Sequence, residues 1–236
     1  MAGKLAKYSL GFTLIELLVV LAVMAVLMGM LGFSVLSGNA DINSGQRQIL
    51  SMIHQTRTTA LSTGQEARLM VYSDPSDLEK YMRFSSIGVR EITPQGNNVT
   101  SKDWRIVQEG KFLPDGLWFV DKSMEVDLGW MGNAFSVWST PDGDNSFQLG
   151  ELKNGLREEG NSGKNSYRYI AFAPSGKVIS DDYPNMPKLV IASGEIRPKD
   201  GVLSPYLPNP QDVAGVQIMP FGGIFSLEFN DFLQNE

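Results

Sequence analysis

The chain has 236 residues, of which 20 are Lys or Arg and 26 are Asp or Glu, so its net charge at pH 7 is −6. This acidity argues against nucleic acid as a partner, because binding to phosphates needs a basic surface. The chain has no cysteine, which excludes a disulfide framework and thiol chemistry. Its length suits one or two domains.

The first predicted element is an apolar helix over residues 12–36. It spans 25 residues with a single ionisable side chain, Glu16. As an α-helix this segment is roughly 37 Å long, whereas the hydrocarbon core of a bilayer is about 30 Å thick. Lys4 and Lys7 precede it and no acid does, which is the charge bias of a segment left on the cytoplasmic side. We therefore predict a single-pass transmembrane helix.

Glu16 is the unusual residue of this helix, because a carboxylate inside a membrane span costs a few kcal/mol and points to a function. Cleavage between Gly11 and Phe12 would free an α-amino group one helical turn before Glu16. Between staggered subunits, the carboxylate of one can meet the amine of the next. We predict that Glu16 acts in assembly; the alternative is that it snorkels to the membrane interface.

A conventional secretory signal peptide is a competing interpretation of the same segment. Gly38 and Ala40 would form a small-residue cleavage site for it. The apolar run is longer than the usual about 7–15 residues of such signals, which disfavours this interpretation.

The segment Gly11-Phe12-Thr13-Leu14-Ile15-Glu16, behind a short basic leader, resembles the prepilin signal of type IV pilins and type II secretion pseudopilins. The resemblance implies that a prepilin peptidase cuts after Gly11 and methylates the new N-terminal Phe12. It also implies that Glu16 directs subunit registration. The match covers about 25 of the 236 residues.

An amphipathic helix is predicted next, ending at Thr63-Gly64. Over residues 42–62 a period of 3.6 places apolar residues on one stripe and polar residues largely off it. The predicted stripe is Ile49, Leu50, Ile53, Ala60 and Leu61, and the residues off it are Gln46, Arg47, Gln55 and Arg57. If both helical parts join, the helix is about 77 Å long. A helix with one half in the membrane and one half on a globular head is the pilin architecture.

The remainder is predicted to be β-rich, because short apolar runs alternate with turn signals. The predicted strands are Glu66–Ser73, Lys80–Arg90, Trp104–Gln108, Leu117–Val120, Ala134–Trp138, Tyr167–Ala173, Lys177–Ser180, Lys188–Ala192, Val216–Met219 and Ile224–Phe229. Residues 148–165 are expected to form a polar loop, and residues 198–210, with four prolines, an irregular connection. The predicted fold class is α+β, with the long N-terminal helix packed on an antiparallel β-sheet head.

Two later segments resemble the GspH/FimT type of minor pseudopilin. Residues 59–69, Thr-Ala-Leu-Ser-Thr-Gly-Gln-Glu-Ala-Arg-Leu, are similar to the helix-to-first-strand junction of that group. Residues 169–178, Tyr-Ile-Ala-Phe-Ala-Pro-Ser-Gly-Lys-Val, are similar to its Phe-x-Pro-x-Gly hairpin. The long segment 104–165 has no counterpart that the resemblance places.

Few side chains suggest chemistry. Asp142 and Asp144 lie in a Pro-Asp-Gly-Asp sequence that resembles a calcium loop, and some pseudopilins bind calcium. The spacing of an EF-hand is absent, so we interpret the segment as a turn and predict no metal or other cofactor. His54, the single histidine, is expected to be a solvated or half-packed helix residue and not part of a catalytic triad. The tryptophans Trp104, Trp118, Trp130 and Trp138 are expected to lie mostly in the core.

We predict a structural subunit and not an enzyme. Its parts are a cleaved leader (1–11), a membrane and assembly helix (12–36), an amphipathic continuation (37–65) and a periplasmic head (66–236). By resemblance it is a minor pseudopilin of a type II secretion pseudopilus in the inner membrane. Its predicted partners are the prepilin peptidase, other pseudopilins or pilins, the inner-membrane assembly platform and lipid. The alternatives are a minor type IV pilin or competence fibre subunit and, in another class, a membrane-anchored periplasmic binding domain.

Overall fold

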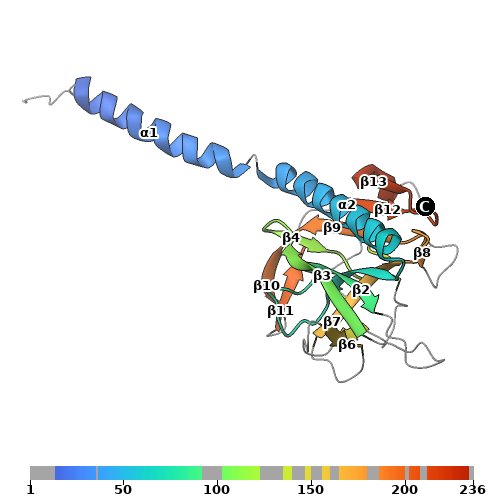
Figure 1. Ribbon diagram of the computed structural model, residues 1–236. Coiled ribbons are helices and arrows are strands. Elements are labelled where there is room, and N and C mark those ends of the chain that lie inside the picture. The colour runs from blue at the N-terminus through green and yellow to red at the C-terminus, as the bar shows by residue number, and fades with distance from the viewer. Residues whose placement is uncertain are drawn as a thin grey trace, which may run out of the picture. The chain divides into compact units, whose positions relative to one another are not determined.

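The computed structural model describes residues 14–35, 37–91, 103–122, 135–139, 147–149, 156–159, 165–179, 186–199, 202–207 and 212–233 (Figure 1). The chain divides into two compact units, Met1–Gly38 and Asn39–Glu236. The first unit contains the helix α1 (Leu14–Val35), and the helix α2 (Ser37–Thr63) leads into the second. The second unit, with α2 and an antiparallel β-rich body, is the head of the α+β fold.

The described residues of the head form three sheets, in which every strand pairing is antiparallel. The largest has the order β5-β7-β1-β2-β3-β6, and β8 also pairs with β7. Its strands are β1 (Ala67–Tyr72), β2 (Phe84–Glu91), β3 (Asp103–Phe112), β5 (Phe147–Leu149), β6 (Leu156–Glu158), β7 (Asn165–Phe172) and β8 (Val178–Ile179).

The second sheet has the order β13-β12-β9-β4 and the third is the hairpin β10-β11. Their strands are β4 (Leu117–Phe119), β9 (Lys188–Ser193), β10 (Glu195–Lys199), β11 (Val202–Tyr206), β12 (Val213–Ile218) and β13 (Ile224–Glu228). A short helix, α3 (Phe229–Leu233), follows β13.

α2 packs one stripe of its surface into the main core of the head. The buried positions of α2 recur every three or four residues: Ile42, Gly45, Ile49, Met52, Ile53, Thr56 and Ala60. This core also takes residues from both large sheets, such as Leu69 of β1 and Ile191 of β9. α2 therefore lies where the two sheets meet, and Figure 1 shows it along that side of the head.

The predicted stripe of α2 is confirmed at Ile49, Ile53 and Ala60 but wrong at Leu61, which is half-exposed. Two residues predicted to lie off the stripe in fact hold the head. Gln46 donates hydrogen bonds to the carbonyls of Gly215 and Leu227. Arg57 donates hydrogen bonds to the carbonyls of Gly176 and Phe221, which lie in two turns of the head. Both are long polar side chains at the rim of the stripe, where their ends can reach backbone carbonyls of the head.

β1 is buried on both faces because neighbouring strands flank it and separate cores cover its two sides. Ala67, Leu69 and Val71 face the main core under α2. Met70 and Tyr72 face a smaller core on the opposite side of the sheet, together with Trp104. A third core, which contains Trp118, covers the outer face of the second sheet.

Most predicted strands are confirmed with shifted ends, and three predictions are wrong. Residues 135–138 form no strand: only Val137 makes a bridge, to Lys188, because this segment passes from one sheet to the other. The predicted loop over 148–165 contains most of β5 and all of β6, which add to the edges of the large sheet.

The predicted irregular connection over 198–210 includes part of the β10-β11 hairpin. Pro198 pairs with Leu203 and Pro205 with Ile196, two steps apart in the register. In an antiparallel pair, residues two apart share the same hydrogen-bonding class. Both prolines can therefore occupy positions at which the pairing of the two strands needs no N–H donor. Proline is tolerated here also because each strand of a two-stranded sheet is an edge strand.

Candidate functional site

The predicted signal lies mostly outside the described residues. Lys4, Lys7, Gly11 and Phe12 fall there, so cleavage and methylation stay predictions. Glu16 is exposed in the first turn of α1, the end of a helix that favours an acidic side chain.

α1 presents large apolar side chains that the chain itself does not cover. Every described side chain from Leu14 to Met24 is exposed, and Leu14 reaches 82%. Over the residues whose description allows the test, no helix is long and apolar enough to count as a membrane span. The predicted span over 12–36 reaches beyond these residues and stays a prediction.

The candidates for metal binding and hydrolysis do not form a site within the described part of the chain. Asp142 and Asp144 lie outside the described residues. Among those that are described, no three His, Cys, Asp or Glu side chains gather to hold a metal ion. His54 is exposed on α2, which confirms the interpretation of a solvated helix residue.

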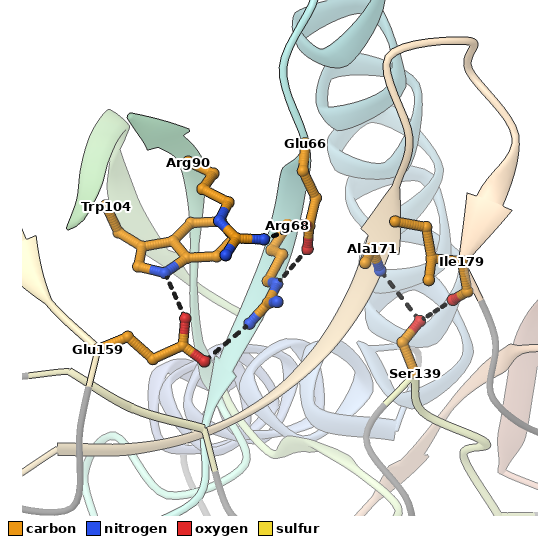
Figure 2. Close-up of polar contacts among 8 residues, drawn as sticks. All are labelled: Glu66, Arg68, Arg90, Trp104, Ser139, Glu159, Ala171 and Ile179. Atoms are coloured by element: carbon orange, nitrogen blue, oxygen red, sulfur yellow. Dashed lines mark hydrogen bonds and ion pairs between the residues drawn. The ribbon is translucent and has the colours of Figure 1, made fainter. Parts of the chain in front are cut away.

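A cluster of charged side chains surrounds Arg68 on the face of the large sheet opposite the main core (Figure 2). We call it the Arg68 cluster; its members are Glu66, Arg68, Arg90, Trp104, Glu159 and Tyr169. Arg68 pairs with Glu66 at 2.7 Å and with Glu159 at 3.8 Å. Trp104 donates its indole N–H to Glu159 at 2.9 Å, and Arg90 pairs with Glu66 at 3.4 Å.

The Arg68 guanidinium is also held between two aromatic rings. It lies 4.2 Å from the ring centre of Trp104 and 4.0 Å from that of Tyr169. A planar guanidinium stacks on aromatic faces and pairs with carboxylates at its edges. Only 8% of Arg68 is exposed, so the charge is satisfied inside the head and ties β1 to β3, β7 and the segment at Glu159. The cluster is a structural ion-pair network.

A second set of buried polar contacts connects the two large sheets. We call residues 135–139 the strap. Ser136 accepts a hydrogen bond from the Val190 N–H of β9 and donates one to its carbonyl. Ser139 accepts from the Ala171 N–H of β7 and donates to the Ile179 carbonyl of β8 (Figure 2). Each buried serine thus bonds to the backbone of a different sheet, and the strap joins them.

Asp121 anchors the middle of the strap. Its carboxylate accepts the Trp138 indole N–H at 2.7 Å and pairs with Arg168 at 3.4 Å, and it is 1% exposed. Burial, with the nearby Asp121 charge, raises the pKa of Tyr81 to about 12. Both effects keep Tyr81 neutral, which suits a core residue and not a proton donor working near neutral pH.

The tryptophan prediction is confirmed for three residues. Trp104, Trp118 and Trp138 are at most 5% exposed, and Trp130 lies outside the described residues. Neither the Arg68 cluster nor the strap was predicted from the sequence. A weak signal for the first exists in Glu66-Ala67-Arg68, where an arginine sits inside an otherwise apolar strand.

The comparisons with known proteins identify the N-terminal segment. Residues 6–32 match the prokaryotic N-terminal methylation motif. The matched range contains Gly11, Phe12 and Glu16. No curated protein and no solved structure matches the chain. This motif is the prepilin-type signal, and it implies processing by a prepilin peptidase and assembly with other pilins. That signal ahead of an antiparallel β-rich head supports a likeness to type IV pilins and pseudopilins.

Proposed function

We propose that this protein is a minor pseudopilin of a type II secretion pseudopilus, a structural subunit without catalytic activity. The observation that carries the proposal is the methylation motif at residues 6–32. Within it, Gly11 precedes the cut, Phe12 becomes the methylated N-terminus and Glu16 is the assembly carboxylate. Lys4 and Lys7 hold the leader on the cytoplasmic side of the inner membrane, and the head lies in the periplasm.

The surface of α1 supports an assembly role. Leu14, Ile15 and Leu17 are 82%, 71% and 59% exposed. Burying a side chain of this kind contributes about 1.5–3 kcal/mol, so the helix gains much from an apolar environment outside its own chain. Membrane lipid provides that environment before assembly, and neighbouring pilin helices provide it in the fibre.

Two features of the head favour the minor pseudopilin over other pilin-like proteins. α2 ends at Thr63, Gly64 follows with φ of +65°, and β1 starts at Ala67, in the segment that resembles the GspH/FimT junction. β7 and β8 form a tight hairpin around Gly176, whose φ is +75°, in the second such segment. These features support the assignment alongside the motif.

The test is the mass of the mature chain, made in cells that contain a prepilin peptidase. We expect a chain that begins at Phe12 with one added methyl group. Gly11→Val should leave the full-length precursor, because the branched side chain blocks the cleavage site. Gly38→Val is the matched control and should be processed like the wild type.

Other outcomes of the mass measurement contradict the proposal. A wild-type chain that still starts at Met1 would mean that the N-terminal helix is not processed and only anchors the protein in the membrane. A chain that starts at Asp41, and whose cleavage Gly38→Val prevents, would identify a secretory signal peptide.

A deletion strain separates type II secretion from type IV pili. Loss of protein export, restored by the wild-type gene, supports the pseudopilus. If export is normal but twitching or DNA uptake is lost, the protein would instead be assigned as a minor type IV pilin or a competence fibre subunit. If export, twitching and DNA uptake are all unchanged, the result would favour the remaining alternative, a membrane-anchored periplasmic binding domain.

A further inference from the structure

β13 is an edge strand with little of the protection usual at an edge; at its last residue, Glu228, the N–H is bonded to Asp231 of the same chain. Among the described residues it pairs with β12 on one side and with no strand on the other. Its pairing with β12 runs from Ile218↔Ile224 to Ala214↔Glu228 without a bulge. Its sequence, Ile-Phe-Ser-Leu-Glu, has no proline or lysine. Edges that stay unpaired usually carry such residues or a bulge, so this strand is suited to pair with another one.

The same edge exposes aromatic side chains. Phe225, within β13, is 54% exposed, and Phe221, in the turn that leads into it, is 74% exposed. Large aromatic residues at this exposure are typical of the centre of a protein interface.

Charge is distributed unevenly along this edge. At its start Lys177 lies 5.2 Å from the ring centre of Phe221. At its end are two exposed acids, Glu228 and Asp231, and Asp231 accepts the Glu228 backbone N–H at 2.7 Å. The edge is therefore basic at one end and acidic at the other.

We propose that β13 pairs antiparallel with β13 of a second copy of this chain, around a two-fold axis at Ser226. This register places Phe225 of one copy opposite Leu227 of the other, on the same face of the joined sheet. It brings the Lys177 end of each copy beside the Glu228 end of its partner. An isologous contact repeats each interaction twice, so both ends are complementary.

The backbone around the edge is already held in place. Arg57 of α2 donates to the Gly176 and Phe221 carbonyls at 3.1 and 3.2 Å, and Gln46 donates to the Leu227 carbonyl at 3.0 Å. α2 thus fixes both ends of β13, which lowers the ordering cost of pairing. The inference goes beyond the proposed function and does not depend on it.

The first experiment uses single cysteines, which give a clean background because the chain has none. Residues paired with themselves across a two-fold axis have Cα atoms about 4.5–5.5 Å apart, a spacing that a disulfide spans. In the full chain, purified in detergent, Ser226→Cys should form a covalent dimer under mild oxidation. Ser76→Cys, in the exposed turn after β1, is the matched control and should stay monomeric. Equal rates for the two variants would overturn the proposal.

The second experiment exchanges the charges and measures dimer dissociation by sedimentation of the full chain. Lys177→Glu and Glu228→Lys should each weaken the dimer about tenfold, because two attractive contacts become repulsive. The double variant restores opposite charges and should recover most of the affinity. A wild-type chain that stays monomeric at submillimolar concentration would overturn the proposal. A dimer that none of the three variants weakens would place the contact elsewhere and would overturn it too.

Discussion

α1 and β1 are both apolar segments that carry one charged residue, and their surroundings differ. In β1 all six residues are buried, and Arg68 has its carboxylates and its aromatic rings within the head. In α1 the described side chains, Glu16 included, are exposed. A charge whose partners belong to its own fold contributes to folding. A charge exposed on a helix whose apolar side chains are exposed as well is suited to assembly.

The largest expected effect comes from Glu16. Glu16→Leu should insert and be processed but enter fibres more than about tenfold less than the wild type, because it removes the carboxylate that we propose to pair with the amine of Phe12 in the neighbouring subunit. The measurement is the amount of subunit in sheared or cross-linked fibres. Glu16→Gln keeps the size and removes the charge, so it should fail as well. Normal incorporation of either variant would break the comparison, because the acid of α1 would then have no assembly role.

Arg68 should affect stability and not assembly. Arg68→Met leaves the carboxylates of Glu66 and Glu159 without their shared cation, and removing one partner of a buried ion pair costs about 3–5 kcal/mol. Chemical denaturation of the full chain measures it. The matched control is Arg197→Met, at an ion pair with Glu195 in which both side chains are more than half exposed, where we expect less than about 1 kcal/mol.

A further variant sharpens this result. In Arg68→Met with Glu66→Gln and Glu159→Gln, no carboxylate is left without Arg68, and Arg90, whose side chain is 42% exposed, keeps its charge near solvent, so part of the lost stability should return. A loss that stays unchanged would mean that packing against Trp104 and Tyr169 explains the effect.

How far the sequence predicts the molecule also differs between the two regions. The signal is a local pattern, and its resemblance to the prepilin signal pointed to Gly11, Phe12 and Glu16, which all lie inside the segment that the methylation motif matches. The organisation of the head as a helix on antiparallel sheets is predicted by local patterns too, because the helix and most strands have the periodicity of their secondary structure. Arg57 shows the limit: it was predicted to lie off the packed stripe of α2, yet it bonds to residues more than 100 positions away.

The remaining features of the head depend on contacts that no local pattern contains. Trp138 lies in an apolar run that predicts a strand, but its backbone belongs to the strap between two sheets. Pro198 and Pro205 predict an irregular chain, but a two-stranded hairpin tolerates both. Arg68 stands out among apolar neighbours, but its pairing with Glu159 does not follow from the sequence because the two residues are remote from each other along the chain. In each case tertiary pairing overrode local propensity.

Ser139 tests whether the strap joins the sheets, and its effect should be smaller than that of Arg68. Ser139→Ala leaves the Ala171 N–H and the Ile179 carbonyl without this partner, which costs about 2 kcal/mol. Thermal or chemical unfolding measures it. Ser51→Ala, at an exposed position of α2, should change stability by less than about 0.5 kcal/mol. Equal losses of stability at the two serines would mean that the strap does not help to hold the two large sheets together.

The smallest expected effect is the difference between two glycines that both have positive φ. At Gly64, where φ is +65°, an added Cβ meets nothing within 4 Å, so Gly64→Ala should cost only the conformational strain of about 1 kcal/mol. At Gly222, where φ is +82°, the same atom lies 2.4 Å from Nε of Arg57 and 2.7 Å from the Gly176 carbonyl oxygen. Gly222→Ala should therefore cost about 1 kcal/mol more. In an Arg57→Ala background this excess should shrink but persist, because the carbonyl remains. Equal costs at the two glycines would show that α2 does not hold these turns tightly.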